Sequence, residues 1–387
     1  MNTTIRAAVL LGGIFWVQVS RGETIGGPLL ATPLDSLAKF QAGRTAFEEI
    51  ETPEDGLGPI FNGKSCGECH SAGATGGGSE RIETRFGVSG EVFDPLSSHG
   101  GSLIQTDGIG PYGTCEWTYV GGIVPDVATV VAGRRSTPLF GLGLIEGVPD
   151  STLEALAARQ ARIAGETPGS PTGRAARMVD IASGESRIGR FGWKNQVATI
   201  LTFSGDAYLN EMGITTPIFP EESCPNGDCT LLACDPIPGV DDDMEDLILT
   251  DFMTFLAPVA PAASYPAGSR VFNRIGCNDC HTRTLTTGAN ANPALDRVTF
   301  HPFSDFLLHD MGINGDGVAQ GDAGPSEMRT APLWGLRFAP SFLLDGRARS
   351  IEEAILGHAG EGEPARSRFI RLKSRDRAAL LRFLGAL

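Results

Sequence analysis

The chain has 387 residues, of which 41% are hydrophobic and 20% are charged, a composition typical of a globular protein with a buried core. Its formal net charge of -15 argues against nucleic-acid binding, because phosphate groups are bound by basic surfaces. The 51 glycines and 25 prolines predict long ordered loops.

The N-terminal residues predict export. Arg6 precedes an uncharged, mostly apolar run at residues 7–20, which is short for a membrane span and suits a signal peptide. We therefore expect residues 1–22 to be a cleaved signal peptide and the mature protein to be periplasmic. An uncleaved N-terminal anchor is the alternative. No other stretch is long and apolar enough to cross a bilayer.

Two Cys-x-x-Cys-His motifs lie far apart in the chain, at Cys66, Cys69 and His70 and at Cys277, Cys280 and His281. A zinc site would need a second Cys/His pair near each motif, and a thioredoxin-like disulfide has no role for the histidine. Covalent haem explains every residue, because the two thiols add to the vinyl groups and the histidine binds the iron. The sequence therefore predicts two covalently bound haem c groups.

The surroundings of the two motifs are duplicated. Residues 42–50 (AGRTAFEEI) and 267–275 (AGSRVFNRI) precede the motifs, and each predicts a short helix that directs an aromatic ring toward the haem. Downstream, residues 135–142 (RSTPLFGL) match residues 329–336 (RTAPLWGL). Helices are predicted to follow, at residues 151–165 and 350–360.

This repeat predicts a mainly α-helical protein of two cytochrome c-like haem domains related by internal duplication. The first domain is expected at residues 23–258 and the second at residues 265–387, joined through a Pro/Ala-rich linker at 256–268. Arg135 and Arg329 occupy equivalent repeat positions and are expected to pair with haem propionates, with a structural ion pair as the alternative.

The remaining cysteines, Cys115, Cys224, Cys229 and Cys234, are expected to form disulfides in an oxidising compartment. The sequence leaves the three pairings open, but the even spacing of the last three predicts at least one bridge among them.

The two copies differ in their sixth iron ligand. Ser350 and Glu353 form a capping box, and Ile351, Ile355 and His358 then share one helix face, so His358 is expected to bind the second iron. His309 and Met311 are its rivals. The matching first helix, 152–164, carries no histidine or methionine, which predicts a first haem open to peroxide. His99 is either a removable ligand of that haem or an exposed residue.

Several segments resemble the di-haem oxidoreductase family, relatives of bacterial di-haem cytochrome c peroxidases. They are residues 56–70, 190–196, 303–312, 329–336 and 345–366. Aligned on Asp345 and Gly346, the resemblance also places His358 at the ligand position, although Leu344 stands where relatives usually have histidine.

The resemblance implies that peroxide reacts at the N-terminal haem while the C-terminal haem relays electrons from a redox protein of the cytochrome or cupredoxin type. Glu146 is then the expected distal acid, whereas Glu154 is expected to cap its helix. Trp193 is a candidate electron relay. Calcium occurs between the domains of related peroxidases, and the loop 314–322 is a candidate site for it. The alternatives are a di-haem electron-transfer cytochrome and an enzyme that oxidises a partner protein.

Overall fold

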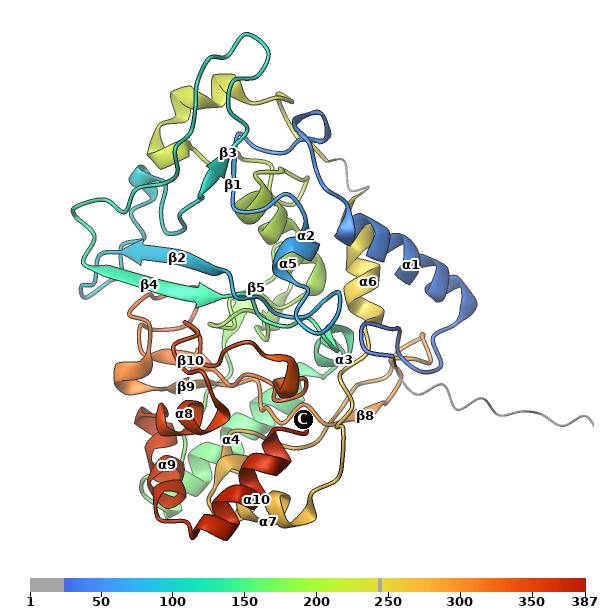
Figure 1. Cartoon of the computed structure of the whole chain (residues 1–387), viewed down its shortest axis with the longest axis vertical. Coiled ribbons are helices and arrows are strands. Elements are labelled where there is room, and N and C mark those ends of the chain that lie inside the picture. The colour runs from blue at the N-terminus through green and yellow to red at the C-terminus, as the bar shows by residue number, and fades with distance from the viewer. Residues whose placement is uncertain (1–23, 243–245) are drawn as a thin grey trace, which may run out of the picture.

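The computed structural model describes residues 24–242 and 246–387. The predicted signal peptide therefore lies outside the described residues. Figure 1 shows most of the chain up to α6 in its upper part and α7 to α10 in its lower part, where α4 also lies. Within the described ranges, no helix is long and apolar enough to cross a membrane.

The helices are α1 (Leu34–Glu48), α2 (Cys66–Cys69), α3 (Leu142–Glu146), α4 (Asp150–Glu166), α5 (Ile200–Ala207), α6 (Leu249–Phe255), α7 (Pro266–Arg274), α8 (Ile351–Leu356), α9 (Glu363–Ile370) and α10 (Ser374–Leu384). The strands are β1 (Ile60–Phe61), β2 (Ile82–Gly87), β3 (Asp107–Gly108), β4 (Val130–Arg135), β5 (Arg177–Val179), β6 (Ser186–Ile188), β7 (Leu285–Thr286), β8 (Thr299–Phe300), β9 (Leu308–Asp310) and β10 (Glu327–Arg329). They form five antiparallel pairs, β1–β3, β2–β4, β5–β6, β7–β8 and β9–β10.

The prediction of a mainly α-helical fold is wrong. Helices make up 34% of the structure and strands 14%, so most residues lie in loops and turns. The glycine-rich and proline-rich segments explain the difference, because they separate the few helices at each haem motif with long irregular connections. Short hairpins such as β2–β4 close these connections without forming a larger sheet.

The duplication is visible in two equivalent helix pairs, in which α1 packs against α6 and α7 packs against α10 (Figure 1). A Cβ atom on Gly43 of α1 would lie 2.5 Å from the carbonyl oxygen of Ile248, and one on Gly268 of α7 would lie 2.2 Å from that of Ala379. Each glycine of the repeated sequence therefore lets its helix approach the backbone of the partner closely.

The repeated phenylalanines also occupy equivalent places. The ring of Phe47 lies 6.1 Å from that of His70, and the ring of Phe272 lies 6.4 Å from that of His281. In both copies the helix before the motif thus holds an aromatic ring against the motif histidine, as the sequence predicted.

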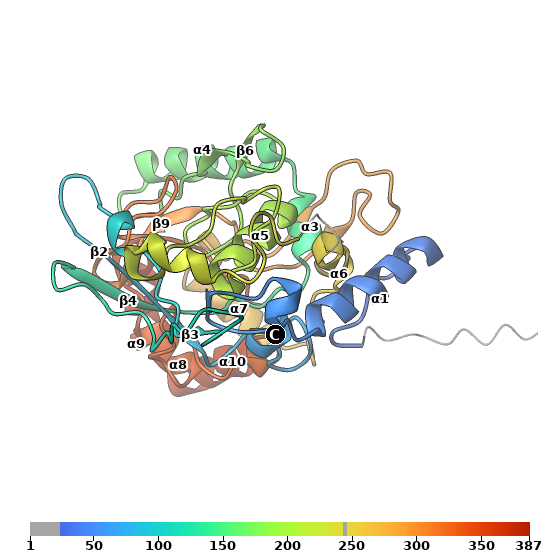
Figure 2. The same ribbon diagram turned by 90° about the horizontal axis from the view of Figure 1, so that it is seen from above.

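The two halves interlock rather than lie apart. Helix α4 belongs to the first half but contacts the second, where Gln160 donates a hydrogen bond to the backbone oxygen of Asp279. Figure 2 shows α4 covering one side of the molecule, opposite α8 and α10. Arg134 forms a buried ion pair with Asp316 across the same boundary. The segment predicted as a linker joins the end of α6 to the start of α7.

Two disulfides, Cys115–Cys234 and Cys224–Cys229, join the four remaining cysteines. The second confirms the predicted bridge within the closely spaced group. The first ties the loop between β3 and β4 to the segment before α6.

Candidate haem sites

The second motif lines a cavity of about 340 Å³. Cys277 and Cys280 are free thiols at its edge. The Nδ1 atom of His281 lies 2.9 Å from the carbonyl oxygen of Phe303, which can only accept a hydrogen bond, so Nδ1 donates and Nε2 keeps its lone pair. Burial lowers the pKa of His281 to about 4, which keeps the ring neutral. This is the state in which an imidazole binds iron.

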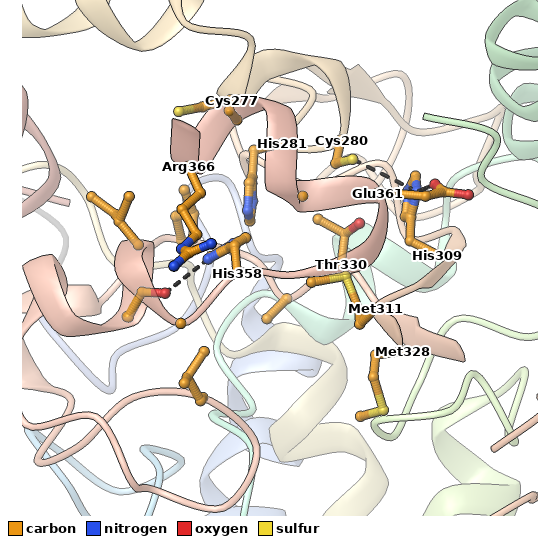
Figure 3. Close-up of a pocket in the computed structure, with 18 of the residues that line it drawn as sticks. Cys277, Cys280, His281, His309, Met311, Met328, Thr330, His358, Glu361 and Arg366 are labelled. Carbon is orange, nitrogen blue, oxygen red and sulfur yellow. Dashed lines mark hydrogen bonds and ion pairs between the residues drawn. The ribbon is translucent and has the colours of Figure 1, made fainter. Parts of the chain in front are cut away.

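His358 lies on the other side of this cavity, and Figure 3 shows the rings of His281 and His358 both directed into it. Its Nδ1 atom donates to the carbonyl oxygen of Ala354 at 2.8 Å, again leaving Nε2 with a lone pair. The helix prediction needs one correction, because α8 ends at Leu356 and His358 follows it. Gly357 forms the C-cap of the helix, and the turn after it aims His358 into the cavity.

The start of α8 agrees with the predicted cap in part. The Ser350 hydroxyl accepts a hydrogen bond from the amide of Glu353, but the Glu353 carboxylate accepts from the amide of Arg349.

Of the two alternative ligands predicted for the second iron, Met311 lines the cavity and His309 has both ring nitrogens engaged. Both ring nitrogens of His309 face carboxylates, at 2.6 Å from Glu361 and 3.0 Å from Asp305, so His309 has no lone pair to offer. Met311 does line the cavity, as does Met328, which the sequence analysis did not single out. Figure 3 shows both methionines at the cavity.

Arg135, Arg329 and Trp193 line this same cavity, although they come from different parts of the chain. Arg135 donates to the carbonyl oxygen of Leu343 and Arg329 to that of Gly192. Burial lowers the pKa of each guanidinium to about 10, and neither has a carboxylate partner within the described ranges. A buried cation without an anion is costly, so the two carboxylates of a haem would complete this cavity.

A further guanidinium was missed by the sequence analysis. Arg366 lines the cavity beside His358 (Figure 3), and its buried Nε atom has no hydrogen-bond partner among the described residues. The thiols, the two imidazoles and these cations together fit a haem at the second motif.

At the first motif, too, a backbone carbonyl orients the motif histidine. Cys66 and Cys69 are the ends of α2, and the Ser65 hydroxyl caps this helix by accepting from the amide of Gly67. The Nδ1 atom of His70 lies 3.1 Å from the carbonyl oxygen of Gly77, and burial lowers the pKa of His70 to about 4. Neither cysteine is in a disulfide, and the two thiols with the oriented neutral imidazole fit haem attachment here as well.

No second imidazole approaches His70 among the described residues. The first half of the chain has one other histidine, His99, which is exposed and packs on the turn that contains Gly227. Met212 is buried in the core with 4% exposure.

The two motifs lie on either side of one short segment. Thr137 lies against the imidazole of His70 and also lines the cavity of the second motif, together with Arg135 and Pro138. The indole nitrogen of Trp193 donates to the backbone oxygen of Arg135 at 2.8 Å. Trp193 is therefore anchored to the segment that both motifs contact.

Glu146, the expected distal acid, and Glu154, the expected cap, both have partners in the structure. The Glu146 carboxylate accepts a hydrogen bond from the amide of Ile200 at the start of α5, and burial raises its pKa. Glu154 is exposed and forms an ion pair with Arg177. Helix α4 begins at Asp150 and has no side-chain cap, so the capping role predicted for Glu154 is not formed.

A carboxylate cluster near the first motif was missed. Glu211 accepts from the side-chain amide of Asn62 at 2.9 Å, and its charge interacts with the Cys69 thiol. Burial and then the nearby Glu83 raise the pKa of Glu211 to about 8, whereas Arg85 pairs with Glu83 at 3.0 Å. The likeness of residues 210–213 (NEMG) to residues 309–312 (HDMG) is the sequence signal that could have drawn attention to Glu211.

The loop 314–322 does not present free oxygens for calcium. Asp316 is buried between two cations, with Arg134 at 2.6 Å and Lys194 at 3.0 Å, and Asp322 pairs with Arg174 at 2.6 Å. These side chains neutralise the carboxylates that a calcium ion would need.

Comparison with known proteins defines the class of this molecule. Residues 124–233 and 250–387 match the family model described as "Di-haem oxidoreductase, putative peroxidase". The chain belongs to this family, and it is therefore an oxidoreductase that carries haem. No curated protein sequence matches the chain.

Two solved structures are distantly similar. One is the hydrazine synthase of Kuenenia stuttgartiensis, with 13% identity, full coverage of both chains and a TM-score of 0.39. The other is a MauG-like protein associated with microbial copper homeostasis, with 15% identity, coverage of 95% of this chain and 94% of that chain, and a TM-score of 0.39. Neither likeness is close enough to assign a function.

Proposed function

We propose that this protein is a periplasmic di-haem c peroxidase, in which peroxide is reduced at the haem of Cys66, Cys69 and His70. The haem of Cys277, Cys280 and His281 then relays the electrons. The donor is a small redox protein of the cytochrome or cupredoxin type, which an acidic protein of net charge -15 attracts through a basic surface.

The main support for this proposal is that, among the described residues, two imidazoles are available to an iron at the second motif and one at the first. At the second cavity, His281 and His358 each keep Nε2 available, which suits an iron bound on both sides. At the first motif, His70 has no counterpart among the described residues, which suits an iron with an open position. An iron bound on both sides transfers electrons, whereas an open iron binds a substrate.

The chain supplies two further functions. Trp193 and the segment 135–138 connect the two sites, so that electrons need not leave the protein between them. Arg135 and Arg329 hold the propionates of the second haem. When bound, an open haem supplies the iron and the electrons that cleave the O–O bond of peroxide.

The protein must also move protons, because reduction of hydrogen peroxide to two waters takes up two electrons and two protons. Glu146 is the proposed acid, held by its hydrogen bond from the Ile200 amide, with a pKa that burial raises. Glu211 is the alternative, since it lies beside Cys69 and its pKa is about 8.

Electron paramagnetic resonance of the two-haem protein tests the proposal. We expect one high-spin and one low-spin ferric signal in the oxidised or the half-reduced state, and loss of the high-spin signal when peroxide is added. Two low-spin haems that do not respond to peroxide in either state would refute a peroxidase and favour an electron-transfer cytochrome.

A further inference from the structure

His309 lies at the centre of a buried polar network beside the second haem motif. Its side chain is 2% exposed, and both of its nitrogens face carboxylates, Glu361 at 2.6 Å and Asp305 at 3.0 Å. Carboxylates only accept hydrogen bonds, so both nitrogens donate and the ring is an imidazolium. Burial lowers the pKa of His309, but the hydrogen bonds to Asp305, Cys280 and Glu361 outweigh it and raise the pKa to about 12.

One of these carboxylates belongs to the loop that carries His358. Glu361 lies three positions after His358, in the short turn Gly360–Gly362. A Cβ atom on Gly362 would lie 2.9 Å from the Cδ2 atom of His358, so this turn packs directly on the imidazole. A displacement of Glu361 therefore displaces His358.

The first half of the chain holds the same network from the other side. Thr172 donates to Glu361 through its amide at 3.0 Å and through its hydroxyl at 2.6 Å. Gln160 of α4 donates to Asp305 at 2.7 Å. A Cβ atom on Gly173 would lie 2.4 Å from the ring of His309, so the backbone of the first half touches this imidazole.

Figure 3 shows the three histidines around this cavity in two kinds of position. His281 and His358 face each other across it, whereas His309 stands beside Cys280 and Glu361 at its side. His309 makes no contact that would let it replace either of them, because its two nitrogens are already engaged.

We propose that His309 is a positioning residue that ties the His358 loop to the first half of the chain. In this arrangement His358 stays on the second iron only while the interface through Thr172 and Glu361 is closed. The proposal rests on the proposed ligand role of His358. It adds that exchange of this ligand is controlled from the other half of the molecule, through charge-assisted hydrogen bonds.

Ligand exchange at the second haem tests this role in the complete two-haem protein. The variants are His309→Gln, Thr172→Val and His358→Ala, and the probe is cyanide, whose slow binding phase reports displacement of His358. We expect this phase to be at least tenfold faster in His309→Gln and several-fold faster in Thr172→Val. The fast phase at the first haem should be unchanged.

Glu363→Gln is the matched control, since Glu363 directly follows the turn Gly360–Gly362 as the first residue of α9, and its carboxylate accepts a hydrogen bond from the Ser367 hydroxyl. It should keep the wild-type rates. If His309→Gln fails to incorporate haem, Thr172→Val becomes the test of the positioning role. This substitution removes only the Thr172 hydroxyl, which lies outside the cavity. Wild-type exchange in a fully loaded Thr172→Val protein would overturn the proposal.

His358→Ala separates this proposal from the proposed function. If this variant turns the second haem high-spin while His309→Gln and Thr172→Val exchange cyanide at wild-type rates, the ligand assignment stands and the positioning role fails. If the second haem stays low-spin in His358→Ala, His358 is not the ligand, and the positioning role fails with it.

Discussion

The two haem motifs begin from the same unit and lie in different surroundings. In each, a glycine lets the preceding helix cross its partner, a phenylalanine packs on the motif histidine, and a backbone carbonyl orients that histidine. Beyond this unit, the second motif lies among imidazoles and unpaired guanidiniums, whereas the first lies near carboxylates. The shared unit would serve haem attachment, and the segments outside it would determine what each iron can do.

The largest expected effect comes from removing one haem at a time. Cys66→Ser with Cys69→Ser should lose one haem and all peroxide turnover. Cys277→Ser with Cys280→Ser should also lose one haem and steady-state turnover, but the remaining haem should still react once with peroxide. Haem content and stopped-flow spectra measure this difference. If both double variants react with peroxide alike, the two haems do not have separate roles in peroxide reduction and electron relay.

The next effect concerns the proton donor at the first site. Glu146→Gln is expected to slow the reaction with peroxide about 10²–10⁴-fold without loss of haem, the range typical of a general acid. Glu154→Gln is the control, because its exposed ion pair with Arg177 should contribute little. A normal rate in Glu146→Gln together with a slow Glu211→Gln would move the role to Glu211.

The duplicated glycines provide a test of the shared unit. Gly43→Ala and Gly268→Ala would each bring a methyl group against the backbone of the crossing helix, and each should reduce the free energy of unfolding by about 1–3 kcal/mol. Gly165→Ala in α4, where no atom lies within 4 Å of the added group, should be neutral or slightly stabilising. Denaturation of the haem-loaded proteins measures these free energies of unfolding. If Gly165→Ala is destabilised as much as the other two variants, the close helix contacts are not the cause.

The smallest expected effect is a difference in pH dependence. The pKa of Glu211 is raised to about 8 in the folded protein, so the folded state binds a proton more tightly than the unfolded state does. Its contribution to stability is therefore present at low pH and is lost as the pH rises toward 8. Glu211→Gln should show a smaller drop in melting temperature between pH 5 and pH 8.5 than the wild type. An identical drop would mean that Glu211 is not protonated in the folded state.

Local patterns predicted the parts of the structure that local chemistry determines. The motifs, the helices before them, the phenylalanines and the candidate ligand His358 all follow from spacing over a few residues. The balance of helix and loop did not follow, because helical repeats reveal little about the connections between them.

Long-range contacts were beyond the reach of the sequence. Asn62 and Glu211 meet although they lie 149 positions apart, and His309 meets Glu361 across 52 positions. The equivalent positions of Arg135 and Arg329 suggested one arginine for each copy of the repeat, yet both line the cavity of the second motif. The sequence repeat therefore predicts the structure near each motif, but the two halves contact each other in a way that the repeat does not predict.

The two unpaired guanidiniums constrain the order in which the protein matures. Arg135 comes from the first half and Arg329 from the second, and each is buried against a backbone oxygen of the other half, Leu343 and Gly192 respectively. Burying two cations without anions opposes closure, and the propionates of a haem remove this opposition. If the second haem is attached as proposed, its propionates would favour the docking of the halves, and the cofactor would then act as a part of the assembly and not as a late addition to a finished molecule.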